Sequence, residues 1–248
     1  MIETNKIYCG DCLEILSGLP DKSIDLVFTS PPYNMRTRIR NGEYTTREKT
    51  EHFSKKYKHF DDALPIDEFY SFHKKVLTEL LRVSKLVLYN FQIVTGSKEA
   101  FFKIIGDFHK DIKDIIVWDK RHGQPAMHSN ILNNTYELIL ILEDDKKCGR
   151  MIQNAIFKRG TLSNVWRVIG NKKTDVSGHS ASFPEELAKI AITNFSKEGD
   201  IVLDPFLGTG TVALVAKKNN RKYIGIEICE EYYKAAEVKL SQPTIFEE

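Results

Sequence analysis

The 248-residue sequence lacks the features that would place it in a membrane or mark it for export. No stretch approaches the roughly 20 consecutive apolar residues of a membrane-spanning helix, and residues 1–6 contain no apolar signal-peptide core. We therefore expect a soluble, cytoplasmic protein. A strong charge of either sign is also missing: the net charge is +2, so composition gives no global signature of a polyanionic partner. Hydrophobic residues make up 42% of the chain, enough for the core of one large domain.

Cysteine is scarce as well. Cys9 and Cys12 form a C-x-x-C pair, whereas Cys148 and Cys229 are single and distant. A structural zinc site takes four ligands, usually as two spaced pairs. The sequence therefore predicts no metal site, and local packing at a strand end explains the pair more simply.

Short apolar runs alternate with segments of helical periodicity along most of the chain. Strands are predicted at 7–10, 24–29, 86–91, 114–118, 136–142, 201–203 and 223–228, and helices at 67–84, 98–109, 184–195, 211–218 and 230–241. Strands that alternate with helices predict an α/β fold whose mainly parallel sheet is covered on both faces.

The tetrapeptide Ser30-Pro31-Pro32-Tyr33 directly follows the apolar run 24–29. Two prolines cannot continue a sheet ladder, because neither has an amide donor and each fixes φ at about −65°. The residue before a proline is extended too, so the chain leaves the strand as a rigid turn. Its carbonyl oxygens, its serine hydroxyl and its aromatic ring suit the capture of an amino group on a planar base. A strand-ending turn with an ordinary surface tyrosine is the alternative at this point.

A second motif, 204–211, is a glycine-rich turn between a predicted strand and a predicted helix. Gly208 and Gly210 allow a tight bend and a close approach of the backbone to a ligand, and the helix-start amides favour a carboxylate or phosphate. Glu227 ends the next predicted strand, about 20 residues on, where a Rossmann-type unit places a ribose-binding carboxylate. The loop spells neither G-x-G-x-x-G nor a P-loop, which argues against dinucleotide and P-loop classes. A tight turn with a solvated glutamate is the alternative.

Together the two motifs resemble the circularly permuted β class of S-adenosylmethionine-dependent DNA amino-methyltransferases, in which the Ser/Asp-Pro-Pro-Tyr motif precedes the cofactor loop. Segments 10–14, 134–139 and 179–187 resemble further motifs of that class, in the class order. The last segment has Phe183-Pro184 where Lys-Pro is commoner, so no lysine role is carried over. The resemblance spans nearly the whole chain. It implies a circularly permuted, Rossmann-like methyltransferase sheet in a single catalytic domain, 1–248.

The resemblance also implies site residues. Ser30 Oγ and the Pro31 carbonyl would accept the two hydrogens of an exocyclic amine, and Tyr33 would stack on a base flipped out of the duplex. Because the amine attacks directly, no cysteine nucleophile is required. The expected catalytic residues are Ser30, Pro31, Pro32 and Tyr33. Those expected to bind S-adenosylmethionine are Asp11, Ser180, Phe183, Asp204, Pro205, Phe206, Gly208, Thr209, Gly210, Thr211 and Glu227.

Two segments interrupt the β-α pattern and mix basic with aromatic residues, which suits phosphate contact and base stacking. The first, a basic loop at 34–60, follows the catalytic turn and is expected to be mobile without DNA. The second, 143–178, is interpreted as the target-recognition region. Charge runs are usually solvated surface, but a near-neutral chain that concentrates positive charge in two insertions favours DNA contact. The residues expected to bind duplex DNA are Arg36, Arg38, Arg40, Lys55, Lys56, Lys58, Lys158 and Arg159.

The target base is suggested by the string 28–33, which resembles the form typical of cytosine amino-methyltransferases; adenine enzymes more often carry Asp or Asn in place of Ser30. The expected function is therefore site-specific methylation of cytosine N4 in duplex DNA, within a restriction–modification system. Adenine-N6 methylation by the same design and a catalytically inactive DNA-binding protein are the alternatives. Many relatives pair up, so a homodimer is open, as is a cognate restriction endonuclease.

Overall fold

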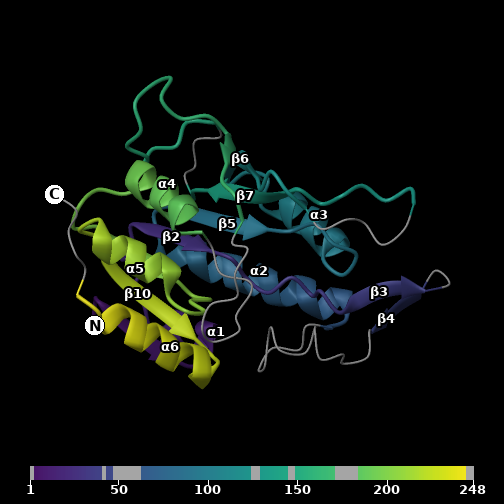
Figure 1. Ribbon diagram of the computed structural model, residues 1–248, viewed down its shortest axis with the longest axis horizontal. Coiled ribbons are helices and arrows are strands. Elements are labelled where there is room, and N and C mark those ends of the chain that lie inside the picture. Colours follow the sequence, from purple (N-terminus) through teal and green to yellow (C-terminus); the bar gives the residue numbers. More distant parts are fainter. Residues whose placement is uncertain are drawn as a thin grey trace.

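The computed structural model describes residues 3–40, 43–46, 63–123, 129–144, 149–170 and 184–243. An eight-stranded sheet forms its centre, in the order β1-β10-β9-β2-β5-β7-β6-β8 (Figure 1). In that order the strands are β1 Lys6–Cys9, β10 Lys222–Glu227, β9 Ile201–Asp204, β2 Leu26–Thr29, β5 Val87–Phe91, β7 Tyr136–Leu142, β6 Ile112–Asp119 and β8 Val165–Arg167. Neighbours pair in parallel except at β7, which is antiparallel to both β5 and β6. The predicted mainly parallel sheet is confirmed.

Helices cover both faces of this sheet. Leu26 and Phe28 of β2 pack into one core and Val27 into the other, because successive strand side chains point to opposite faces. The first core is closed by α4 Glu185–Phe195, α5 Thr211–Lys218 and α6 Glu230–Ser241, and the second by α1 Cys12–Ser17, α2 Ile66–Val83 and α3 Lys98–Asp107. The central strands β2 and β5 are buried along their whole length, which is why they appear in the sequence within apolar runs. Within the described ranges, no helix is long and apolar enough to span a membrane.

Helix α1 and strand β8 are short elements that were not predicted. Helix α1 begins directly after Asp11, whose Oδ1 accepts hydrogen bonds from the amides of Leu13 at 2.7 Å and Glu14 at 3.3 Å. Strand β8 has only three residues and lies inside the segment interpreted as the target-recognition region. Both are too short to show periodicity, and β8 exists because it pairs with β6, far away in the sequence.

The segment expected to be a basic loop contains a β-hairpin. Strand β3 (Thr37–Arg40) pairs antiparallel with β4 (Glu43–Thr46), and the hairpin projects from one end of the molecule (Figure 1). The expectation of a loop is therefore wrong for these residues, because β-branched and aromatic residues alternate with polar ones across the hairpin. Residues 47–62 lie outside the described part of the chain, and with them Lys55, Lys56 and Lys58.

Candidate active site

The two motifs predicted to cooperate meet at the carboxyl edge of the sheet. Strand β2 ends at Thr29 and its parallel neighbour β9 ends at Asp204. Thr29 Oγ1 donates a hydrogen bond of 2.7 Å to Asp204 Oδ1, and both groups are buried. The proline turn and the glycine loop therefore leave the sheet side by side, although 175 positions separate the bonded residues. This is the edge at which open α/β sheets bind their ligands.

The proline turn is buried except at its first residue. Pro31, Pro32 and Tyr33 are buried, whereas Ser30 is partly exposed. Only 7% of Tyr33 is exposed, and its ring centroid lies 6.2 Å from that of Phe91. The alternative of an ordinary surface tyrosine is therefore excluded. Stacking of Tyr33 on a flipped base stays a prediction.

Behind the turn, a buried polar network surrounds the Tyr33 hydroxyl. Asn90 Nδ2 donates to Tyr33 Oη at 2.5 Å and to Glu137 Oε2 at 2.6 Å. Tyr33 Oη donates to Glu137 Oε2 at 3.2 Å and is hydrogen-bonded to Ser30 Oγ. Lys120 Nζ lies 3.1 Å from the other oxygen of Glu137. Strands β5 and β7 and the residue directly after β6 thus supply polar groups to the proline turn.

Asn90, Glu137 and Lys120 were not predicted from the sequence to be site residues, although Glu137 belongs to segment 134–139, which resembles a motif of the class. One signal was available: Asn90 stands inside an apolar strand and Glu137 near the start of another, where a polar residue needs a buried partner. What was missing is the pairing of β5 with β7, which places these residues at the same edge of the sheet.

His73 of α2 lies beneath the turn. Its side chain is fully buried, and Nδ1 is hydrogen-bonded to Tyr89 Oη of β5 at 2.6 Å. Burial lowers the pKa of the His73 imidazole to about 3, and the backbone of Pro32, which faces the ring, opposes this shift. The ring is therefore neutral near physiological pH and forms part of the packing under the double-proline turn.

The glycine loop is held by β10. The amide of Gly208 donates to Glu227 Oε2 at 2.7 Å, and the amide of Leu207 donates to the carbonyl of Ile226 at 2.9 Å. Gly210 has φ of 83° and lies so close to α6 that an added Cβ would be 3.1 Å from the Cβ of Ala236. Glycine is needed there for both reasons.

Three acidic residues stand at the ends of adjacent strands, as a cofactor with amino and hydroxyl groups requires. Asp11 follows β1, Glu227 ends β10 and Asp204 ends β9. Asp11 caps α1, and Glu227 also accepts a bond of 2.8 Å from the Cys229 amide, so both acids brace the backbone. Thr209 Oγ1 is buried and has no hydrogen-bond partner among the described residues. These donors and acceptors fit S-adenosylmethionine, and their individual cofactor roles stay predictions.

The carboxyl of Asp204 has a strongly shifted pKa. Burial raises the pKa of its carboxyl to about 7; hydrogen bonds from Thr29 and the Phe206 amide lower it, and the charge of Glu227 raises it further. A buried acid with such a pKa, between two functional motifs, is typical of a ligand-binding position.

The predicted DNA-binding residues are not gathered in one place. Arg36 follows the proline turn, and Arg38 and Arg40 belong to β3. Lys158 and Arg159 are exposed next to the end of α4, where the Ile156 amide donates to the Asn194 carbonyl. Since α4 leads into the amino end of β9, these two residues lie at the edge of the sheet opposite Ser30. The chain crosses between the two edges through β8, which the sequence did not reveal. Ser180 and Phe183 fall outside the described ranges.

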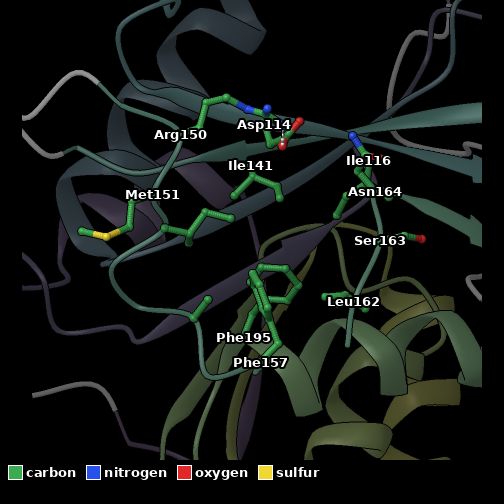
Figure 2. A pocket seen from close by; sticks show the side chains of 12 residues that line it. Asp114, Ile116, Ile141, Arg150, Met151, Phe157, Leu162, Ser163, Asn164 and Phe195 are labelled. Atoms are coloured by element: carbon green, nitrogen blue, oxygen red, sulfur yellow. Dashed lines mark hydrogen bonds and ion pairs between the residues drawn. The ribbon is translucent and has the colours of Figure 1, made fainter. Parts of the chain in front are cut away.

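A hollow of about 510 Å³ lies away from both motifs (Figure 2). It is formed by β6, β7, the segment 149–164 and the end of α4. Phe157 and Phe195 contact each other on one side, and Arg150 pairs with Asp114 at 2.5 Å on the other. Its lining includes no residue of the two motifs, so it is not the candidate active site.

A proline turn beside a glycine loop, at the carboxyl edge of a parallel sheet with one reversed strand, defines a Rossmann-like methyltransferase. Residues 24–238 match the model of the DNA methylase family, which comprises N6- and N4-directed enzymes, and the chain belongs to that family. The circular order is also confirmed, since the turn follows β2 and the glycine loop follows β9.

Relatives and solved structures agree with this assignment. The Type II methyltransferase M.HinfI of Haemophilus influenzae is 30% identical over 96% of this chain and 68% of that protein. M.BglII of Bacillus subtilis is 29% identical over 92% and 66%, so the chain spans about two thirds of the length of these relatives. PvuII DNA methyltransferase (cytosine-N4-specific) superposes with a TM-score of 0.71 at 18% identity, covering 99% and 89% of the two chains. The M1.HpyAVI–SAM complex gives 0.60 at 21%, covering 96% and 99%. At these identities the two structures establish the fold.

Proposed function

We propose that this protein transfers a methyl group from S-adenosylmethionine to the N4 amino group of cytosine at a specific site in duplex DNA. The observation that carries the proposal is the Thr29–Asp204 hydrogen bond, because it joins the amine-binding turn to the cofactor loop. Serine at position 30 favours cytosine by resemblance, and the Type II relatives favour a site-specific enzyme of a restriction–modification system.

The chain's own residues perform the binding and the orientation. Ser30 Oγ and the Pro31 carbonyl accept the two amine hydrogens and direct the nitrogen lone pair toward the glycine loop. When bound, S-adenosylmethionine supplies an electrophilic methyl group. The positive charge that develops on the nitrogen meets acceptors already fixed by the rigid turn, which is electrostatic preorganisation. Alignment of the two reacting groups lowers the barrier further.

The test is to incubate the protein with labelled S-adenosylmethionine and mixed duplex DNA, digest the DNA to nucleosides and identify the labelled base. We expect label in N4-methylcytosine. Label in N6-methyladenine would establish the alternative enzyme, which shares the site. Cofactor binding without transfer to any duplex would overturn the proposal in favour of a DNA-binding protein without catalysis.

The structure also suggests which basic residues contact the duplex. Arg121 follows β6 and Arg167 ends β8, so both are exposed at the carboxyl edge beside Lys120. Replacing Arg121 and Arg167 by alanine should lower the slope of log affinity against log salt concentration by about 2, one unit for each lost phosphate contact. Replacement of Lys158 and Arg159, at the opposite edge, should change the slope less. A larger change of slope on replacing Lys158 and Arg159 than on replacing Arg121 and Arg167 would instead support DNA contact by Lys158 and Arg159, as predicted from the sequence.

A further inference from the structure

We propose that Glu137 is a positioning residue that fixes the Ser30 hydroxyl as a hydrogen-bond acceptor for the target amine. This assignment rests on the proposed function and names a residue that neither motif contains. It acts through Tyr33, whose hydroxyl lies between the two groups.

The direction of each hydrogen bond between Ser30, Tyr33 and Glu137 follows from which groups can donate a hydrogen. A carboxylate only accepts hydrogen bonds, and the amide nitrogen of Asn90 only donates. Tyr33 Oη receives one bond from Asn90, at 2.5 Å, and sends its single hydrogen to Glu137, at 3.2 Å. It has no hydrogen left for Ser30. The bond between Ser30 and Tyr33 must therefore use the serine hydrogen. Asn90 Nδ2 also lies 3.4 Å from Ser30 Oγ and faces one of its lone pairs, which leaves the other lone pair for the amine.

The carboxylate also fixes the orientation of Asn90. Its Nδ2 lies 2.6 Å from Glu137 Oε2, and the reversed amide would place two oxygens there. The ammonium group of Lys120, 3.1 Å from Glu137 Oε1, balances the negative charge and completes a charge-assisted chain. The directions of the hydrogen bonds that Tyr33 and Asn90 make thus depend on an acceptor at position 137.

Burial makes this arrangement effective. Asn90 is 0% exposed, Tyr33 7% and Glu137 9%, so water does not compete for their hydrogen bonds. Ser30 is the partly exposed member, at the open end of the chain. An exocyclic amine arrives as a donor of two hydrogens. A freely rotating Ser30 hydroxyl could point its own hydrogen at the amine, which is unproductive. The hydrogen bonds that run from Glu137 through Tyr33 to Ser30 exclude that orientation.

Glu137→Gln tests the assignment, because glutamine has the same shape but its amide can donate to Tyr33 and reverse the chain. Tyr33→Phe breaks the same link without changing charge. Asp25→Asn is the matched control: Asp25 pairs with Lys85 at 2.6 Å at the opposite edge of the sheet. Retention of cofactor affinity and melting temperature verifies that each variant is folded.

The first readout needs no turnover. Affinity is measured, with S-adenosylhomocysteine present, for a duplex carrying the methylated site and for one whose target base lacks the exocyclic amine (2-pyrimidinone for cytosine, purine for adenine). The cost of flipping each base is common to all variants and cancels in the comparison. Relative to the wild type and Asp25→Asn, the preference for the amine should fall about 10-fold in Glu137→Gln and in Tyr33→Phe, the loss of one hydrogen bond.

The second readout is single-turnover methyl transfer. We expect the rate of Glu137→Gln to fall about 100-fold with little change in KM for the cofactor, because a preorganised contact is lost. The Tyr33→Phe/Glu137→Gln double variant should be no slower than the slower single variant, since both substitutions disrupt the same series of hydrogen bonds. If the wild type is active and Glu137→Gln keeps the same rate and amine preference, the positioning role of Glu137 is overturned while the proposed function stands. A wild type that methylates no DNA would remove the proposed function, and this assignment with it.

Discussion

Asp204→Asn is expected to raise the free energy of unfolding by about 2–4 kcal/mol at about pH 8, although it alters a predicted cofactor-binding residue. The carboxyl titrates near 3.8 when unfolded and at about 7 when folded, because burial disfavours its charge. The destabilisation of the folded state caused by ionising Asp204 is absent below the unfolded pKa. It grows as pH rises between the two pKa values and is complete above the folded pKa. Asparagine keeps the oxygen that accepts from Thr29 and carries no charge.

Urea unfolding at several pH values between about 4 and 8 measures this effect. His73 contributes in the opposite sense: its pKa of about 3 in the folded state, against 6.5, makes stability decline as pH falls. In the wild type the two slopes partly cancel, whereas in Asp204→Asn stability should rise with pH across the acidic range. A variant that is less stable than the wild type at the alkaline end would contradict the assigned cause.

The same variant should bind S-adenosylmethionine more weakly. The cofactor's ammonium group favours an ionised carboxylate, so the charge that destabilises the empty fold is useful when the ligand is present. Such an exchange of stability for activity is common at binding sites. Isothermal titration of wild type and variant with cofactor measures the loss, and equal affinities would place the ammonium group elsewhere.

Gly96→Ala is expected to lower methyl transfer by about 100-fold, because displacement of a catalytic group by about 1 Å has that cost. An added Cβ would lie 2.2 Å from the Asn34 carbonyl oxygen and 2.7 Å from the Thr37 Cβ. Asn34 directly follows the proline turn, and its Nδ2 donates to the carbonyls of Leu64 at 2.9 Å and Gly96 at 3.1 Å. The clash is with backbone, so the turn and the base of the hairpin must move.

Gly106→Ala, on α3, is the matched control, because an added Cβ there meets nothing within 4 Å. We expect it to leave transfer unchanged and Gly96→Ala to keep cofactor affinity, since the glycine loop lies on other strands. Stability of Gly96→Ala should fall by about 1–3 kcal/mol, as in overpacked sites. Full activity in Gly96→Ala would show that the turn does not depend on this contact.

Local patterns predicted most of the elements. The helices 211–218 and 230–241 agree with α5 and α6, and the strand 136–142 agrees with β7, because each carries its own periodicity and end signals. Strand β8 and hairpin β3–β4 were missed because each is short and is defined by pairing rather than by composition. The same distinction applies to Lys158 and Arg159. Their positive charge is evident in the sequence, but the edge of the sheet at which they lie is decided by strand pairing.

The chemistry of the turn and the glycine loop was contained in the sequence, since prolines and glycines dictate backbone shape wherever they occur. Resemblance added the cofactor and the permuted order. Tertiary structure alone decided which side chains stand behind the serine. Asn90 lies in β5, Glu137 lies in β7 and Lys120 directly follows β6, and only the order β5-β7-β6 brings them together. The reason is physical: side chains reach a few ångströms, so contacts between distant residues depend on which strands lie side by side.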